Sequence, residues 1–253
     1  MSAIAYQRKF VRIAEYWNGE VPHLNGVDIE RYFQQPHRIE GMFCRDFYTI
    51  LIDLLQEPET LLAQMKRDTR YEIRRAQREG FVYDFLSGSE TGVFNEFCDY
   101  FDLFAREKNQ PAMRRQWLTL LAEAGVLTLT RIADRTNGTL VWHGYHCSSQ
   151  RATLLYSASI SGDGESSAQR TLVGRANRYQ HWLDMLRFKA NGLSIYDLGG
   201  WYERAEDQKR LSINRFKEEF GGSIVHNYIC ERASTLKGSL FLKLRTALLG
   251  NAI

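Results

Sequence analysis

The chain has 253 residues, of which 44% are hydrophobic, so it can bury a substantial core and is neither disordered nor fibrous. Its formal net charge is only +3, which gives a weak overall case for binding nucleic acid. The first twenty residues carry charges inside their only apolar run, unlike a signal peptide, and no stretch approaches the roughly 18 apolar residues of a membrane span. We therefore expect a cytoplasmic protein without a membrane span.

The four cysteines stand far apart in the sequence, at Cys44, Cys98, Cys147 and Cys230. None belongs to a CxxC pair, so the spacing indicates neither a zinc site nor a redox dithiol nor a disulfide scaffold. We expect buried free thiols in a reducing compartment.

The first part of the chain mixes a weak pattern with a strong one. Residues 1–42 combine aromatic and charged residues without a sustained period, which predicts an N-terminal cap or edge element before a main domain at 43–253. "FYTILIDL" (47–54) is typical of a strand. A single long helix is then predicted from Pro58 to Gly80. One face of this helix is expected to pack, through Leu62, Met65, Thr69, Ile73 and Ala76. Another face is basic and carries Arg67, Arg70, Arg74 and Arg78.

The middle of the chain predicts helices followed by an antiparallel meander. A strand at 81–86 precedes a helix whose aromatic residues, from Phe94 to Phe104, recur at helical spacing and belong in the core, and a second helix follows at 114–125. Three β-rich runs separated by turn residues then predict adjacent antiparallel strands at 126–133, 139–148 and 152–160.

The last part alternates helices and strands. After the loop "SGDGESSAQ" (161–169), the pattern predicts helices and strands in alternation, at 173–192, 194–200, 209–222, 223–231 and 236–250.

This order of elements, together with four motifs, resembles the GNAT-like acyltransferase fold of the Fem-type peptidyltransferases over residues 47–230. The motifs are "RDTRYEIRRAQREG" (67–80), "GRANRYQHW" (174–182), "IYDLGGW" (195–201) and "RFKEEFGG" (215–222). The resemblance implies an α+β fold with a mixed, mostly antiparallel sheet flanked by helices. It also implies that strand 152–160 is central, that strand 194–200 diverges beside it, and that acyl donors bind at this opening.

The resemblance places Lys217 at the reaction centre, where an ammonium group would stabilise the oxyanion of an acyl transfer; the alternative is a solvated lysine on a helix. Asp197 would orient the acceptor amine or take its proton, or would instead cap the local turn. Gly199 and Gly200 permit positive φ or close approach of a ligand to the backbone, or form a plain turn.

Further residues are predicted to bind substrate or donor. Tyr156, Phe216 and Trp201 are assigned to substrate binding. Arg70, Arg74 and Arg75 offer donors suited to phosphate, on a nucleotide-linked acceptor, coenzyme A or a tRNA acceptor stem, or else form a solvated basic face. A cofactor-binding role in receiving the pyrophosphate of coenzyme A at the start of a helix is assigned to Gly174, Arg175, Ala176 and Asn177.

The combined prediction is an N-acyltransferase that moves an acyl or aminoacyl group to an amine of a sugar nucleotide, peptide or metabolite. Acyl-CoA is favoured as donor over aminoacyl-tRNA, with no permanently bound cofactor. A non-catalytic RNA- or partner-binding module, using the arginine helix and the basic final helix, is the alternative of another class. His143 and His146 are expected on opposite faces of a strand, so no metal site is predicted, and a covalent enzyme intermediate is not expected.

Overall fold

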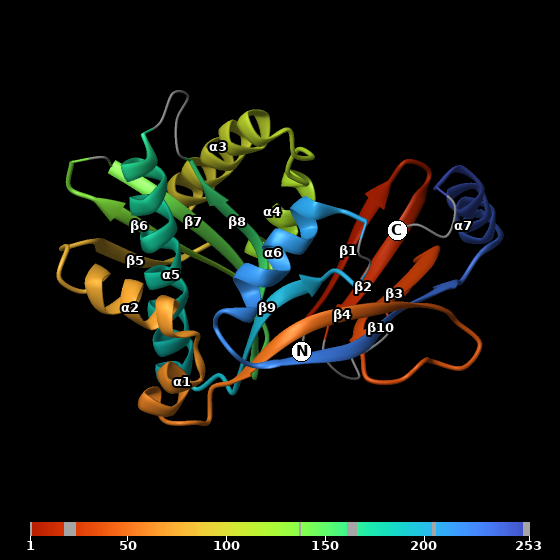
Figure 1. The fold of residues 1–253 in the computed structure, drawn as a ribbon. Helices are drawn as coiled ribbons and strands as arrows, with labels where there is room; N and C mark the ends of the chain where they lie inside the picture. Colours follow the sequence, from red (N-terminus) through yellow and green to blue (C-terminus); the bar gives the residue numbers. More distant parts are fainter. Residues whose placement is uncertain (1, 18–23, 137, 161–165, 204–205, 250–253) are drawn as a thin grey trace. The chain divides into compact units, whose positions relative to one another are not determined.

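The structure, a computed structural model, describes residues 2–17, 24–136, 138–160, 166–203 and 206–249 (Figure 1). Its internal contacts group the chain into two compact units. Residues 1–48 and 225–253 form the terminal unit, and residues 49–224 form the central unit. The first boundary lies near the predicted one at residue 42, but the grouping of the C-terminal residues with the N-terminal segment was not predicted.

The terminal unit is built on a sheet in the order β1-β2-β3-β10-β4. Its strands are β1 (Ser2–Arg8), β2 (Val11–Trp17), β3 (Ile29–Gln35), β4 (Phe43–Asp53) and β10 (Ser223–Ala233), the last two continuing into the central unit. β1 and β2 form an antiparallel hairpin, β2 and β3 are parallel, and β3 and β10 are antiparallel. The cap or edge element predicted for residues 1–42 therefore contains the strands β1, β2 and β3.

Helix α7 (Leu236–Leu249) packs on this sheet through one side. Phe241 joins a buried cluster with Val11, Ile13 and Ile29. A Cβ at Gly238 would lie only 2.0 Å from the carbonyl oxygen of Asp28, so glycine is required where the helix meets the backbone.

Two of the four cysteines are not free thiols. Cys44 on β4 and Cys230 on β10 form a disulfide across a sequence separation of 186 residues, so the prediction of free thiols is wrong for this pair. The strands that carry them are neighbours in the sheet, and the sequence spacing could not reveal that pairing. Cys98 and Cys147 are free, as predicted.

The central unit has a sheet in the order β4-β9-β8-β7-β6-β5. The strands after β4 are β5 (Val82–Ser87), β6 (Leu127–Asp134), β7 (Gly138–Cys147), β8 (Arg151–Ser159) and β9 (Ile195–Trp201). β5 through β8 pair antiparallel, and β8 pairs parallel with β9. The predicted meander and the mixed, mostly antiparallel sheet are confirmed.

Helices flank both faces of this sheet, as predicted (Figure 1). α5 (Ser167–Ala190) contacts β6, β7 and β8 on one face, and α2 (Arg67–Ala76) packs beside it. α3 (Thr91–Lys108) contacts β7 and β8, and α4 (Arg115–Glu123) contacts β6. Alternation along β7 separates the faces: Trp142 lies 5.7 Å from the ring of Phe97 on α3, whereas the next residue bonds to α5.

The long basic helix predicted from Pro58 to Gly80 is two helices. α1 spans Pro58–Gln64, and α2 begins at Arg67. Met65 and Lys66 are extended between them, and the Lys66 amide donates to the carbonyl of Glu219 at 2.8 Å. This tertiary contact favours the break, which local helix propensity does not indicate.

The sheet opens between β8 and β9, as the prediction required. The two strands pair across three positions only, from Arg151 opposite Ile195 to Thr153 opposite Asp197. β8 continues to Ser159 and β9 to Trp201, each beyond this paired segment.

Within the part of the chain that the structure describes, the helices lack the combination of length and apolar character that a membrane span requires.

Candidate active site

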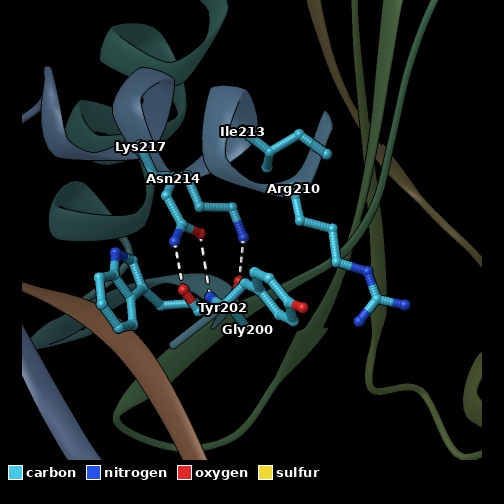
Figure 2. A pocket seen from close by; sticks show the side chains of 7 residues that line it. Gly200, Tyr202, Arg210, Ile213, Asn214 and Lys217 are labelled. Carbon is cyan, nitrogen blue, oxygen red and sulfur yellow. Dashed lines mark hydrogen bonds between the residues drawn. The ribbon is translucent and has the colours of Figure 1, made fainter. Parts of the chain in front are cut away.

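A pocket of about 350 Å³ lies where β9 ends and α6 (Gln208–Glu218) passes it (Figure 2). α6 begins at the N-cap Asp207, whose side chain accepts hydrogen bonds from two backbone amides of the first turn. One side of α6 and the last residues of β9 line the pocket, namely Gly200, Trp201, Tyr202, Arg210, Ile213, Asn214 and Lys217.

Lys217 is the predicted catalytic residue that reaches this pocket. Its Nζ donates to the carbonyl oxygen of Gly200 at 2.6 Å, and two further ammonium protons are available for other acceptors (Figure 2). Burial lowers the pKa of Lys217 to about 8, although the carboxylate of Asp197 opposes the shift. At neutral pH the side chain is therefore mostly charged and only partly hydrated.

Asn214 fixes the geometry of the pocket and was missed by the sequence analysis. It is buried, its Oδ1 accepts from the Tyr202 amide at 3.0 Å, and its Nδ2 donates to the Tyr202 carbonyl at 2.6 Å (Figure 2). These two hydrogen bonds join α6 to the end of β9. The stripe Arg210, Asn214 and Lys217, at spacings of four and three, could have indicated one functional helix face.

Asp197 does not line the pocket, and its charge is already used. It is fully buried; Arg151 donates to its Oδ2 from Nε at 3.0 Å and from Nη2 at 2.7 Å. Its Oδ1 accepts from the Gly199 amide at 2.8 Å and from the Thr49 hydroxyl. This geometry matches the turn-capping alternative and disfavours a direct role as proton acceptor, so we treat Asp197 as a positioning residue.

Gly199 and Gly200 have different functions in the backbone. Gly199 has φ of +73°, and a Cβ there would lie 2.7 Å from the carbonyl oxygen of Leu154 on β8. The close approach at Gly199 is therefore made by the neighbouring strand. Gly200 supplies the carbonyl that holds Lys217.

Of the predicted aromatic residues, only Trp201 lines the pocket. Its Nε1 donates to Glu218 Oε1 at 2.9 Å. Phe216 packs against Phe220, with ring centroids 5.3 Å apart, and under the guanidinium of Arg178 at 5.2 Å. Tyr156 points into the hydrophobic layer of α3, with its ring 4.9 Å from that of Phe101 and 6.4 Å from that of Phe97.

The predicted phosphate-binding arginines lie on α2 and do not line this pocket. Arg70 donates to the carbonyl of Ala63 at 3.0 Å, and Arg75 pairs with Glu79 at 3.0 Å. Arg74 is exposed. The solvated basic face, the alternative considered from the sequence, fits these contacts better.

The predicted pyrophosphate segment, Gly174 to Asn177, is not at a helix start. α5 begins at Ser167, capped by the Ser166 side chain, so these four residues lie inside the helix where their amides bond within it. Arg175 pairs with Glu72 at 2.6 Å, Ala176 is buried, and Asn177 Oδ1 lies 3.0 Å from an imidazole nitrogen. The structural basis of that prediction is therefore wrong.

A buried polar network beneath α5 was also missed. Asp184 Oδ2 accepts from the Tyr145 hydroxyl at 2.6 Å and lies 2.8 Å from His143 Nδ1. The Tyr196 hydroxyl lies 2.7 Å from that of Tyr145 and 2.6 Å from His181 Nδ1. The network joins β7, β9 and α5, and sequence could not reveal it because its members come from three separate elements.

Three members of this network, His143, His181 and Asp184, have potential metal-ligand atoms within 4.8 Å of one another. The sequence pattern drew attention to a different pair, His143 with His146, and this set of three was not predicted. The short distances from these atoms to the tyrosine hydroxyls fit hydrogen bonds within the network. Burial and the nearby cations lower the pKa of His181, so its imidazole is neutral.

Comparison with solved structures identifies the fold. FemX superposes with a TM-score of 0.66 at 10% identity, covering 96% of this chain and 86% of its own. The C-terminal domain of a protein assigned as a lysylphosphatidylglycerol synthetase from Agrobacterium fabrum gives 0.62 at 12% identity, covering 97% and 85%. L-PGS from Bacillus licheniformis gives 0.52 at 10% identity, covering 86% and 72%. The chain thus has a Fem-like fold, which confirms the fold implied by its motifs.

No protein-family model matches the chain, and no curated protein matches it in sequence.

Proposed function

We propose that the protein is an N-acyltransferase that transfers an acyl or aminoacyl group to an amine in the pocket at Lys217. The observation that carries the proposal is the placement of the Lys217 ammonium, bonded to the Gly200 carbonyl, in a pocket at the open end of β9. The Fem-like fold supports the same reaction class.

In the reaction, the lone pair of a neutral amine attacks the carbonyl carbon of an activated ester or thioester. The C–N bond forms while the carbonyl electrons move to oxygen, giving a tetrahedral oxyanion. Lys217 donates to that oxygen, because its ammonium has protons left after binding Gly200. The carbonyl re-forms as the C–S or C–O bond breaks, and the proton lost by the amine leaves with the departing group or solvent.

The structure weakens both of the sequence features that distinguished the two donors. The segment that favoured acyl-CoA lies inside α5, and Arg70 and Arg75, which favoured aminoacyl-tRNA, contact the protein itself. We keep the acyl thioester as the first donor to test because the net charge of +3 offers little attraction for a large polyanion. The acceptor is proposed only as an amine on a nucleotide-linked sugar, a peptide or a metabolite.

The test is a transfer assay with acyl-CoA and aminoacyl-tRNA donors against a panel of amine acceptors. Lys217→Ala should lower turnover by about 100-fold or more, since removal of one oxyanion donor commonly has that effect. Lys209→Ala, on an exposed position of the same helix, is the matched control and should leave turnover unchanged.

Unchanged turnover in Lys217→Ala would return this residue to the solvated-lysine alternative. Absence of transfer from either donor, combined with tight RNA binding that survives Lys217→Ala and weakens steeply with salt, would instead support the non-catalytic RNA-binding module.

A further inference from the structure

The terminal unit exposes an apolar stripe on α7. Leu236, Leu240 and Leu244 are 90%, 54% and 47% exposed. Their spacing of four residues places them on one side of the helix. Isolated exposed leucines are ordinary on protein surfaces, but an aligned set of large apolar side chains forms a patch that calls for an interaction.

This stripe is not the face by which α7 packs. The packing side carries Gly238, Phe241 and Arg245, at spacings of three and four. Gly238 meets the Asp28 backbone, Phe241 is buried, and Arg245 bonds to Glu231. The helix is thus held to the sheet on one side while its leucines face away from that contact.

The turn between β1 and β2 exposes one further apolar side chain, beside the packing side of α7. Phe10 is 45% exposed, and its ring meets that of Phe241 edge-on at 5.8 Å, so the turn lies beside α7 (Figure 1). We name the set Leu236, Leu240 and Leu244 the α7 patch.

The surroundings of the α7 patch are basic. Arg8, at the end of β1, and Lys9, in the turn, precede Phe10, and Lys237 and Lys243 lie on α7. All four side chains are exposed. The sequence of α7 contains no aspartate or glutamate. Lys237 lies 3.7 Å from the mostly buried carboxylate of Asp28, a long ion pair that leaves its side chain 66% exposed.

We propose that the α7 patch docks the protein on the surface of an anionic lipid bilayer. The leucine side chains would enter the boundary between headgroups and acyl chains, and the flanking cations would contact anionic headgroups. An RNA partner would use the cations but gain nothing from three exposed leucines, because nucleic acids are bound through phosphates and base stacking. The combination of apolar stripe and cations therefore favours lipid, independently of the reaction at Lys217.

The experiment is sedimentation of the full chain with vesicles of phosphatidylcholine alone or mixed with phosphatidylglycerol. Wild type should bind the anionic vesicles and bind the neutral ones much more weakly. Leu240→Glu should lower the anionic-vesicle affinity by about tenfold or more, since it places a carboxylate in the membrane contact. Lys237→Ala combined with Lys243→Ala should lower it by about tenfold, because each cation near the surface contributes to binding.

Matched controls come from α3 in the central unit, where Leu103 is 42% exposed and Lys108 is exposed. Leu103→Glu and Lys108→Ala should leave vesicle binding unchanged. Equal losses in the α3 and α7 variants, or no binding of wild type to anionic vesicles, would overturn the proposal.

Two other occupants of the α7 patch can be recognised by separate measurements. A wild-type dimer that Leu240→Glu converts to monomer, without vesicle binding, would assign the patch to a second copy of the chain. RNA binding that depends on Lys237 and Lys243 but is unaffected by Leu240→Glu, again without vesicle binding, would assign the cations to nucleic acid. Either result contradicts the membrane proposal.

Discussion

Arg31 in the terminal unit and Lys217 in the central unit are both cations partly or wholly withdrawn from water, and their surroundings act on their pKa values in opposite ways. Arg31 Nη1 lies 2.7 Å from Glu15 Oε1, and its Nε lies 2.6 Å from Glu231 Oε1. Burial lowers the pKa of Arg31, but the carboxylates of Glu231 and Glu15 together raise it by more than burial lowers it. The pKa of Arg31 therefore lies above its usual value. At Lys217 burial prevails, and the pKa falls to about 8.

The difference lies in the available counter-charge. The carboxylate that acts on Lys217 is that of Asp197, which is already paired with Arg151. The ammonium itself bonds to a neutral carbonyl. Arg31, whose charge two carboxylates balance, holds strands together. Lys217 lies in a pocket without a carboxylate of its own, so its ammonium can interact with a negative charge that develops in a reaction. Burial of charge therefore does not by itself mark an active site.

The largest change in stability should come from removing the charge of Arg31 between Glu15 and Glu231. Arg31→Met should lower the free energy of unfolding by about 3–5 kcal/mol, because two buried carboxylates, Glu15 and Glu231, lose their ion pairs with Arg31. Denaturant titration followed by circular dichroism measures this. Arg38→Met is the matched control: its pair with Asp46 is about half exposed on both sides and should contribute less than about 1 kcal/mol. Similar losses in both variants would contradict the distinction.

Asp197 is a buried carboxylate that pairs with Arg151, and it also raises the pKa of Lys217. Asp197→Asn should lower the free energy of unfolding by about 2 kcal/mol, since Arg151 loses its charged partner while an amide oxygen can still accept one bond. It should also shift the alkaline limb of the rate profile to lower pH, because Asp197 raises the pKa of Lys217. A profile that does not move would show that Asp197 has only a structural role.

The pH dependence tests the charge state at the site directly. The active form carries the ammonium, so kcat/KM should fall as pH rises through about 8, by up to tenfold for each further pH unit. In Lys217→Arg the guanidinium stays protonated, so any remaining activity should lack this limb. An acceptor amine whose pKa lies below 7 should be used, so that its own ionisation does not obscure the result.

The smallest effect is a gain in stability. Lys217→Met should raise the free energy of unfolding by about 1 kcal/mol at pH 7, after allowing for partial solvation, because the folded state disfavours the ammonium. The folded pKa of about 8 lies below the unfolded value near 10.5, so the advantage is full below pH 8 and disappears as pH rises toward 10.5. Lys209→Met should show no such pH-dependent gain.

The sequence by itself predicted the strands of the central unit and the position of α6, because local patterns encode them. The meander β6 to β8, the strand β9 and the helix α6 follow from alternation and helical spacing, which need no knowledge of distant residues. The motifs around Gly199 and Lys217 also led to the Fem-like fold and to the lysine that reaches the pocket.

The tertiary structure decided which groups meet, and those contacts join residues far apart in the chain. Asn214 and Lys217 line the pocket because α6 returns past the end of β9. Asp197 lies outside the pocket and pairs with Arg151 on the parallel neighbour β8. The break between α1 and α2, the Cys44–Cys230 disulfide and the start of α5 at Ser167 were likewise outside local pattern. Spacing encodes the period of an element, while the charge balance at a site depends on which elements the fold places side by side.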